Sequence, residues 1–361
     1  MNIILFCGAF DPVHNGHINM AKVASETLDA EVIFVPAKNA IWKDSEITIE
    51  DKYQMLSLAI KGYPKFKISR YEIDNPDDRV YSINTIKHFR NAYPNDKLFF
   101  LIGSDQVNKF HLWKNPEEIA ELTQIVYYSR SNEEVSSDNI KKYHMQKVVG
   151  EMVNISSTEI RSFHKLDLPI EVLDYIIEHD LYVIPKIKSY MNPKRFAHSV
   201  SVAHLAFDIA ISNNLANPYK YFLACLLHDI GKEMKIVKQK EIVEKLFPEY
   251  VNLESVIYHQ FVGEYLIQRD FGIDDKEILE AVRYHTTGKD DMPPLMAILY
   301  CADKIEPLRG FDSNELIKDM KVNYLEGCKT VFKANKLYFE QRNINYNNPL
   351  TLKAMEYYTK D

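Results

Sequence analysis

Between residues 3 and 128, short apolar runs alternate with stretches whose apolar residues recur at helical spacing. This alternation is typical of a parallel sheet whose strands are joined by crossover helices. The predicted strands are 3–7, 31–35, 66–71, 97–102 and 124–128, and the predicted helices lie near 17–28, 50–61 and 83–92. We therefore expect an α/β, Rossmann-like domain built on a parallel sheet.

The second half of the chain follows a different pattern. After Val183, helical periodicity continues without a convincing strand, so we expect an all-α domain there. A short basic segment, residues 184–188, lies between the two patterns and is expected to be the joint. A chain of 361 residues is long enough for two domains, which we place at residues 1–185 and 186–361.

Composition excludes several classes of protein. The formal net charge of −7 argues against a protein that binds nucleic acid through general phosphate neutralisation. The four cysteines have no paired spacing, which favours buried, reduced thiols. Because we find neither a leader peptide nor an apolar run of membrane-spanning length, we expect a cytoplasmic protein without membrane contact. The oligomeric state stays open, and a homo-oligomer is compatible with the sequence.

The most distinctive motif is GAFDPVHNGH, residues 8–17, which follows an apolar run and leads into a helical pattern. Gly8 and Gly16 let the backbone approach a bulky ligand, and His14 and His17 can both point at one anion near the helix N-terminus. A nucleotide phosphate suits such a site. The ordinary alternative is a glycine turn with two surface histidines.

A second motif is ISSTEIR, residues 155–161. Ser156 or Ser157 is a suitable N-cap, so main-chain N–H groups and hydroxyls would face an anion at the helix start. Arg161 follows one turn later. Taken alone, the motif also fits an ordinary capped helix.

Together the two motifs resemble the His-x-Gly-His nucleotidylyltransferase superfamily, and within it bacterial nicotinate-mononucleotide adenylyltransferases, over roughly residues 1–185. The resemblance implies adenylyl transfer from ATP to nicotinate mononucleotide, which gives deamido-NAD and pyrophosphate in NAD biosynthesis, with Mg²⁺ accompanying ATP. It assigns His14 and His17 to the triphosphate, and Lys43 and Arg161 to the departing pyrophosphate. The implied substrate contacts are Gly8, Ala9, Phe10, Thr85, Asp105, Trp113, Ser156, Ser157 and Thr158.

Several positions depart from the pattern of that family. Ala9 replaces a common threonine, Trp42 stands where histidine is usual, and Ser82 and Asn84 differ from the Tyr-Thr-x-Asp-Thr motif. These changes leave open whether the acceptor ring carries a carboxylate or an amide. Another acceptor, such as a phosphopantetheine or a choline phosphate, remains an alternative. Trp113 suits stacking on a pyridine ring, and it equally suits the core.

The second half carries a set of histidines and aspartates on successive predicted helices. Such side chains converge in the core of a helix bundle and are suitable ligands for two transition metals. A histidine next to an aspartate allows one carboxylate to bridge both ions. The predicted ligands are His198, His228, Asp229, His259, His285 and Asp303.

This set resembles the HD phosphohydrolase superfamily, and residues 284–288 and 302–307 narrow the resemblance to symmetrical bis(5'-nucleosyl)-tetraphosphatases, over roughly residues 188–335. The resemblance implies hydrolysis of diadenosine tetraphosphate to two ADP, with two ions of iron or manganese. Asp229 and Lys232 are the expected catalytic residues, and Arg195 and Lys232 would hold the distal phosphates. Thr286 and Gly288 would shape the adjoining loop.

Alternatives remain for this half. It could hydrolyse a related nucleotide, or act only as a metal-bound nucleotide sensor. The natural substrate, the identity of the metal and any coupling between the two sites stay open. The other histidines are expected to be structural or exposed: His88, His111, His144, His164, His179 and His204.

Overall fold

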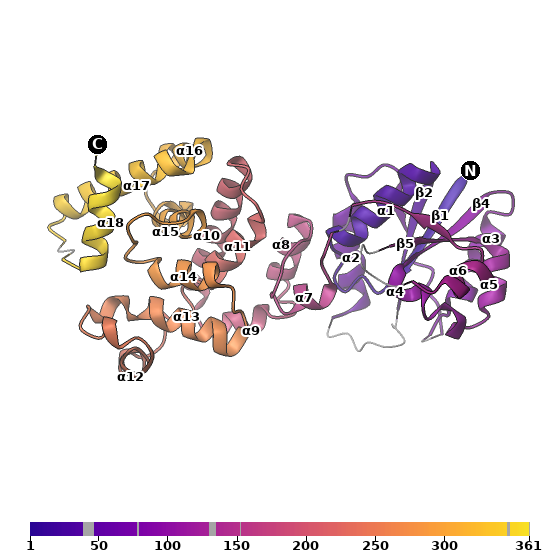
Figure 1. The fold of residues 1–361 in the computed structure, drawn as a ribbon, viewed down its shortest axis with the longest axis horizontal. Coiled ribbons are helices and arrows are strands. Elements are labelled where there is room, and N and C mark those ends of the chain that lie inside the picture. The colour runs from indigo at the N-terminus through magenta and orange to yellow at the C-terminus, as the bar shows by residue number, and fades with distance from the viewer. Residues whose placement is uncertain (39–46, 78, 130–134, 152, 345–346, 361) are drawn as a thin grey trace. The chain divides into compact units, whose positions relative to one another are not determined.

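The computed structural model describes residues 1–361 except 39–46, 78, 130–134, 152, 345–346 and 361. The chain divides into two compact units, the first comprising Met1–Arg161 and Asp167–Tyr182. The second comprises Ser162–Leu166 and Val183–Asp361. The first unit carries the sheet, and the second is helical (Figure 1). Lys43 and Trp42, which the sequence analysis singled out, lie outside the described residues.

A sheet of six parallel strands forms the centre of the first unit. The strands are β1 (Asn2–Gly8), β2 (Glu31–Pro36), β3 (Phe66–Ile68), β4 (Lys97–Gly103), β5 (Gln124–Tyr128) and β6 (Gln146–Val148). Their order is β3-β2-β1-β4-β5-β6, which confirms the predicted Rossmann-like fold. Because the order reverses between β1 and β4, the carboxyl ends of these two strands border the crevice where such sheets bind ligands.

Two strands differ from the prediction. β3 ends at Ile68, because the chain turns away after the N–H of Ser69 donates to the carbonyl of Phe34 at 2.9 Å. β6 was not predicted, since it is only three residues long and exposes Gln146 and Lys147. Short edge strands of this kind lack the apolar run that marks the central strands.

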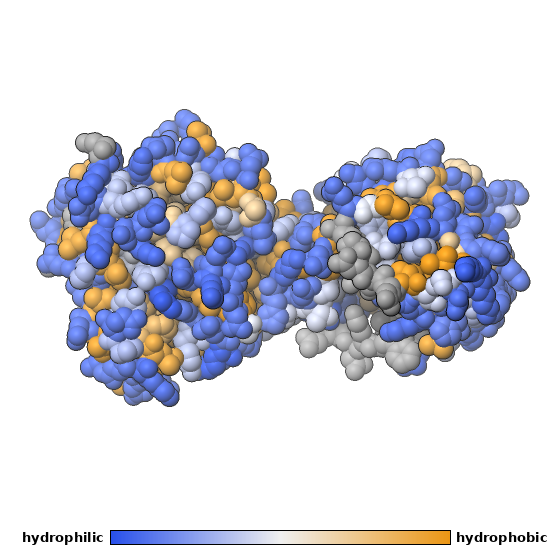
Figure 2. Space-filling view, viewed as in Figure 1, coloured by the Kyte–Doolittle hydropathy of each residue, from blue (hydrophilic) through white to orange (hydrophobic). Residues whose placement is uncertain are grey.

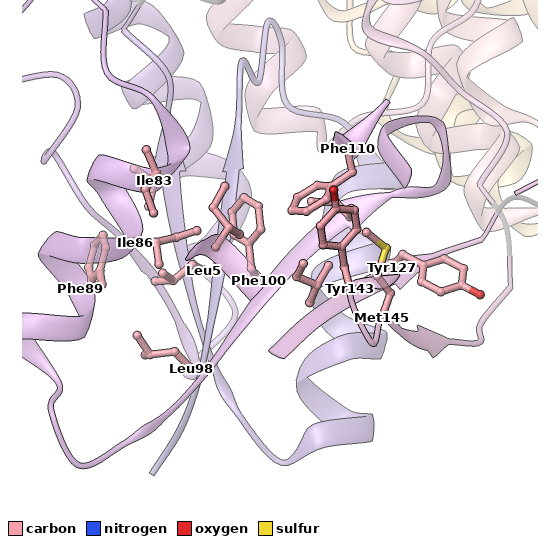
Figure 3. Packing of buried hydrophobic residues seen from close by; sticks show 14 of the residues in the cluster. Leu5, Ile83, Ile86, Phe89, Leu98, Phe100, Phe110, Tyr127, Tyr143 and Met145 are labelled. Atoms are coloured by element: carbon pink, nitrogen blue, oxygen red, sulfur yellow. The ribbon is translucent and has the colours of Figure 1, made fainter. Parts of the chain in front are cut away.

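The sheet is buried on both faces, which explains why its strands read as continuous apolar runs. On one face, Leu5 of β1 and Phe100 of β4 belong to the same hydrophobic cluster as Ile83, Ile86 and Phe89 of helix α3 (Ser82–Ala92) (Figure 3). The alternate residues of these strands are buried against the opposite face. The sheet is therefore a rigid base from which the loops at its carboxyl edge project.

Helices connect the strands of the first unit. They are α1 (Asn15–Leu28), α2 (Ile49–Ile60), α3 (Ser82–Ala92), α4 (Ser104–Val107), α5 (Pro116–Leu122), α6 (Ser137–Lys142), α7 (Ser157–Arg161) and α8 (Ile170–Glu178), with a 3₁₀ turn η1 (Phe110–Leu112). The three predicted helices agree with α1, α2 and α3 to within two residues at each end. α8 packs on α2, where the Tyr175 hydroxyl donates to Asp51 at 2.9 Å.

The second unit contains helices and no strand among the residues described there, which confirms the all-α prediction. The helices are α9 (Ile184–Lys188), α10 (Pro193–Ser212), α11 (Pro218–Leu227), α12 (Ile236–Leu246), α13 (Tyr258–Phe271), α14 (Lys276–Tyr284), α15 (Pro294–Ile305), α16 (Asn314–Val322), α17 (Tyr324–Gln341) and α18 (Pro349–Thr359), with 3₁₀ turns η2 (Pro248–Tyr250), η3 (Ser255–Ile257) and η4 (Pro307–Arg309). The predicted joint at 184–188 is instead helix α9, because Ile184 and Ile187 fall on one side and are buried.

The surface and the cysteines agree with the composition. In the face drawn in Figure 2, hydrophilic residues predominate and hydrophobic ones lie in small separate groups. None of the described helices is both long enough and apolar enough to cross a membrane. All four cysteines are free thiols, as predicted, and Cys225, Cys301 and Cys328 are buried.

Candidate active sites

A cavity of about 260 Å³ lies at the carboxyl ends of β1 and β4, where the strand order reverses. Its wall combines residues from the 8–17 loop, the start of α4 and the segment at the start of α7. The predicted site residues in this wall are Gly8, Phe10, His14, His17, Asp105, Ser156, Ser157 and Thr158. Asn19 and Tyr128 also contribute, although the sequence analysis assigned them no role.

The two histidines of the first motif lie together at the start of α1. Their rings stack, with centroids 3.7 Å apart. The main-chain N–H of His14 donates to Nδ1 of His17 at 3.3 Å. Because Nδ1 of His17 accepts, the neutral ring carries its proton on Nε2, where it can be donated to a phosphate oxygen.

The glycines of this motif allow close packing. A Cβ on Gly16 would lie 2.9 Å from Nδ1 of His14 and 3.2 Å from the side chain of Ile155. A Cβ on Gly8 would lie 3.0 Å from the ring of Phe10. Glycine at position 16 therefore lets Ile155 approach the 8–17 loop, and glycine at position 8 leaves room for the ring of Phe10.

The second motif forms a capped helical turn. The N–H and hydroxyl of Ser156 donate to the carboxylate of Glu159 at 2.9 and 2.7 Å, and the N–H of Glu159 donates to the Ser156 hydroxyl at 3.3 Å. This is a capping box, so Ser156 is the N-cap that the sequence left undecided. The Ser157 hydroxyl donates to the carbonyl of Pro12 at 3.1 Å and ties the motif to the first loop.

Arg161 lies behind the cavity rather than in its wall. Its guanidinium donates to the carbonyl of Asp11 at 2.6 Å and to the Thr158 hydroxyl at 3.1 Å. The carboxylate of Asp11 in turn accepts from the Tyr182 hydroxyl at 2.7 Å. The Arg161 guanidinium therefore joins the first motif, at Asp11, to the second, at Thr158.

Three predicted contacts lie outside the cavity wall, namely Ala9, Thr85 and Trp113. Thr85 is fully buried and donates its hydroxyl to Glu72 at 2.6 Å. Burial raises the pKa of Glu72 to about 7, against the lowering effect of the Thr85 hydrogen bond. Trp113 packs against Phe100 and Phe110, with ring centroids 5.9 and 5.3 Å away. This agrees with the alternative that Trp113 belongs to the core.

In the second unit, the structure brings all six predicted ligands together. One group of donor atoms comes from His198, His228 and Asp229, and a second from Asp229, His259 and His285. Within each group, the donor atoms lie within 4.8 Å of one another. Asp303 adjoins the first group, because its Oδ1 lies 3.0 Å from Nε2 of His198 and 3.6 Å from Nε2 of His228. Asp229 belongs to both groups and can bridge two ions.

Hydrogen bonds orient three of these imidazoles toward the cluster. The Nδ1 atoms of His228, His259 and His285 lie 2.6, 2.9 and 2.7 Å from the main-chain carbonyl oxygen three residues earlier. Nδ1 therefore donates, and Nε2 keeps its lone pair for a metal. Nε2 of His228 is buried and has no hydrogen-bond partner among the described residues. An orphaned buried nitrogen costs about 1–3 kcal/mol, and coordination to a metal removes that cost.

The charges of this donor set suit a divalent metal. Burial is the main reason that the pKa values of His259 and His285 lie below the usual range of histidine. Burial also opposes ionisation of Asp229, but the charge of His228 and the hydrogen bond with His285 hold the pKa of Asp229 well below its usual range. Burial alone would lower the pKa of His228, but the charge of Asp229 raises it.

Cations balance the carboxylates of the cluster. Arg195 donates to Oδ2 of Asp229 at 2.6 Å, and Lys304 donates to Oδ2 of Asp303 at 2.7 Å. The charge of Lys304 keeps the pKa of Asp303 well below its usual range, although burial favours the protonated acid. Each of these buried carboxylates therefore has a cationic partner.

The remaining predicted residues adjoin His259. Nζ of Lys232 and Oγ1 of Thr286 lie 3.1 and 3.0 Å from Nε2 of His259. Burial, opposed by Asp229, lowers the pKa of Lys232. Gly288 has a φ of 68°, a conformation that favours glycine and turns the chain after Thr286.

The sequence analysis gave no role to Lys304, Glu306 or Arg309. Nδ1 of His198 lies 2.9 Å from Oε1 of Glu306, and Arg309 donates to both the carbonyl and the carboxylate of Asp303. Lys304 and Glu306 lie within the segment 302–307, on which the family resemblance partly rests. Their place in that segment could therefore have indicated that they lie near the site. Arg309 had no such signal, because its contact depends on the turn η4.

Comparisons with known proteins find a different family in each half of the chain. The family described as "Cytidylyltransferase-like" matches residues 5–163, and the family described as "HD domain" matches residues 195–308. A Mycoplasma genitalium protein named "Probable nicotinate-nucleotide adenylyltransferase/Ap4A hydrolase" is 32% identical over 333 residues, which are 89% of this chain and 94% of that protein. The chain belongs to this family.

The chain is also similar to a second protein of this nicotinate-nucleotide adenylyltransferase/Ap4A hydrolase family and to a solved HD structure. A Mycoplasma pneumoniae protein of the same name is 28% identical over 348 residues, which cover 92% of this chain and 100% of that protein. A solved Clostridium acetobutylicum structure described as a "predicted HD superfamily hydrolase involved in NAD metabolism" has 30% identity and a TM-score of 0.44, and covers 48% of this chain and 95% of that one. This family membership confirms the prediction that an adenylyltransferase-like domain and an HD domain are joined in one chain. The HD match and the donor groups together indicate a divalent-metal site.

Proposed function

We propose that this chain is a bifunctional enzyme whose two activities reside in residues 1–185 and 186–361. The first activity transfers the adenylyl group of ATP to nicotinate mononucleotide, giving deamido-NAD and pyrophosphate. The observation that carries it is the cavity at the switch point of the sheet, which has the His17 imidazole and the start of α7 in one wall. The names of the Mycoplasma relatives support this substrate.

The chemistry of this half needs no side-chain nucleophile. The phosphate oxygen of the acceptor attacks the α-phosphorus of ATP in line and expels pyrophosphate, with Mg²⁺ accompanying ATP. We propose that the Nε2–H of His17 donates a hydrogen bond to the triphosphate and stabilises the negative charge that develops there. The ring of His14 lies beside it. Arg161 and Lys43 are proposed to bind the departing pyrophosphate. Catalysis therefore depends on positioning and charge stabilisation.

The second proposed activity hydrolyses diadenosine tetraphosphate to two ADP. The observation that carries it is the pair of donor groups that share Asp229. Two ions, iron or manganese, would be held by these groups and Asp303, and they would activate water and neutralise the leaving oxygen. Arg195 and Lys232 are proposed to hold distal phosphates, beside the loop formed by Thr286 and Gly288.

A single preparation of the full chain tests both activities. Deamido-NAD formation from ATP and nicotinate mononucleotide is measured by chromatography, with nicotinamide mononucleotide, phosphopantetheine and choline phosphate as competing acceptors. ADP release is measured from diadenosine tetraphosphate, and the hydrolysis products of a panel of other nucleotides are measured by chromatography. A metal-loaded protein that hydrolyses none of them would reject hydrolysis and favour a nucleotide sensor. Faster transfer to a competing acceptor would reject the proposed acceptor.

A further inference from the structure

His198 differs from the other three imidazoles of the metal cluster. Its Nδ1 lies 2.9 Å from a carboxylate oxygen, Oε1 of Glu306, whereas the Nδ1 atoms of the others face main-chain carbonyls. Nε2 of His198 points into the cluster, 3.0 Å from Oδ1 of Asp303. One imidazole of the set therefore has a charged acceptor behind it, and three have neutral acceptors.

Glu306 is held in place at the end of α15. The residue is only 1% exposed. Its second oxygen, Oε2, accepts from the main-chain N–H of Leu308 at 2.7 Å, at the start of η4. Both carboxylate oxygens thus have a donor, and the side chain joins α10 to the corner between α15 and η4. A group fixed in this way can fix the ring that it contacts.

The contact is confined to one of the two donor groups. His198 belongs to the group with His228 and Asp229, and Glu306 has no recorded contact with His259 or His285 of the other group. A carboxylate that accepts the Nδ1–H of a metal-binding histidine fixes the tautomer, orients the ring and strengthens Nε2 as a donor. These effects reach only the ion that His198 contacts.

We propose that Glu306 is a positioning residue that makes the two metal sites unequal. It tightens binding of the ion at His198, His228 and Asp229, and leaves the ion at Asp229, His259 and His285 unaffected. The inference rests on the proposed metal-dependent function of this half. Its prediction concerns the order and affinity of metal loading, which does not depend on which nucleotide is hydrolysed.

The test uses the full chain, stripped of metal and titrated with Mn²⁺ alone in a calorimeter. The wild type is expected to bind two ions per chain. Glu306→Gln keeps the size of the side chain, but its amide cannot accept from both His198 and Leu308. We expect one ion to bind with unchanged affinity and the other to bind about 10–100-fold more weakly, the usual range for such contacts. Glu306→Asp keeps the charge but not the reach, and is expected to weaken the same ion.

Two controls separate metal positioning from general stability. Glu264→Gln removes a buried carboxylate that pairs with Arg283 and has no recorded contact with a predicted ligand, so it should leave both Mn²⁺ affinities unchanged. His198→Ala should abolish the weakened site outright. Thermal unfolding of the metal-free proteins reports any loss of fold in each variant.

The outcomes are distinct. Two ions bound to Glu306→Gln at wild-type affinities, or two affinities weakened equally, would overturn the role of Glu306 and leave the metal-dependent function standing. A wild type that binds no Mn²⁺, Fe²⁺ or other divalent metal would overturn the proposed function itself. Selective weakening of one ion in Glu306→Gln and Glu306→Asp supports the inference.

Discussion

The first site takes its side chains mainly from two short segments, 8–17 and 155–161. The second takes one or two side chains from, or directly after, each of the helices α10, α11, α13, α14 and α15. In the first, much of the geometry comes from main-chain groups, such as the N–H of His14 and the carbonyl of Asp11. In the second, every predicted ligand is a side chain, and the packing of the helices brings these side chains together. A phosphate can be held by local backbone geometry, but a pair of metal ions needs donors that only a folded bundle brings together.

The two sites also differ in how they handle charge. His17 is partly exposed and is proposed to act as a neutral donor, and the cavity wall at the first site includes, among its described residues, one carboxylate, that of Asp105. Asp229 and Asp303 are buried, and Arg195, Lys304 and Arg309 offset their charge. Removing one member should therefore disturb the second site more than the first.

The largest expected effect is that of Asp229→Ala, which removes the ligand common to both donor groups. Hydrolysis of diadenosine tetraphosphate should fall by ~10³-fold or more, because both ions lose a ligand. Adenylyl transfer should stay within twofold, roughly, since the residue lies in the other unit. Both rates are measured on one preparation, with the exposed Asp208→Ala as the control. Retained hydrolysis would contradict the assignment of Asp229.

Metal removal should affect the activity and the melting temperature of the two units differently. After chelation, Mg²⁺ alone should restore transfer, whereas hydrolysis should need Mn²⁺ or Fe²⁺. A metal at about 1,000 times its Kd stabilises the folded state by ~4 kcal/mol, so Mn²⁺ should raise the melting temperature of the second unit. Scanning calorimetry with and without Mn²⁺ measures the shift, and Asp229→Ala should show little of it. If Mn²⁺ raised the melting temperature of the first unit instead, the assignment of the metal site to the second unit would be wrong.

His17→Ala should have the opposite effect to Asp229→Ala, because it should impair transfer and spare hydrolysis. Loss of a preorganised donor to the triphosphate is expected to lower the turnover of adenylyl transfer by ~10²-fold, with hydrolysis unchanged. Steady-state assays of both reactions measure the effect. His88→Ala, which removes an exposed ring stacked on Tyr71, is the matched control and should leave both rates unchanged. Near-normal transfer by His17→Ala would reject the assigned role.

The smallest effect concerns Glu72, whose pKa burial raises to about 7. Between its unfolded pKa and about 7, the folded state binds more protons than the unfolded state, so stability falls as pH rises through this window. The first unit should lose roughly 1 kcal/mol between pH 6 and pH 8 from this group. Glu72→Gln should remove that loss and stabilise the unit most at pH 8. Unfolding curves at both pH values, for the transition that ATP shifts, provide the measurement; a variant that follows the wild-type slope would contradict it.

The sequence predicted the fold because its strongest signals are local. The strands β1, β2, β4 and β5 are buried on both faces, so their apolar runs mark them directly. The edge strand β6 and the short helix α9 were not predicted, since they are only three and five residues long and carry little periodicity. The metal-ligand set was predicted from residue types and their order along the helices, together with the family resemblance.

The contacts around those ligands could not be predicted in the same way. Thr85 and Trp113 fit the family pattern, yet in the structure Thr85 donates to Glu72 and Trp113 packs with Phe100. Glu306 stood inside a segment that the sequence analysis quoted, but nothing in its spacing revealed the partner. Side-chain partners depend on rotamers and on the approach of other elements, which residue types alone leave open.

The sequence by itself determined that a phosphate-binding parallel-sheet domain precedes a helical domain rich in metal ligands. Periodicity and capping act within a few residues, so the sequence carries them directly. Only the tertiary structure decided that Asp229 is common to two donor groups and that Glu306 lies against His198. Both depend on side chains that are far apart in the sequence, and such side chains meet only once the chain has packed.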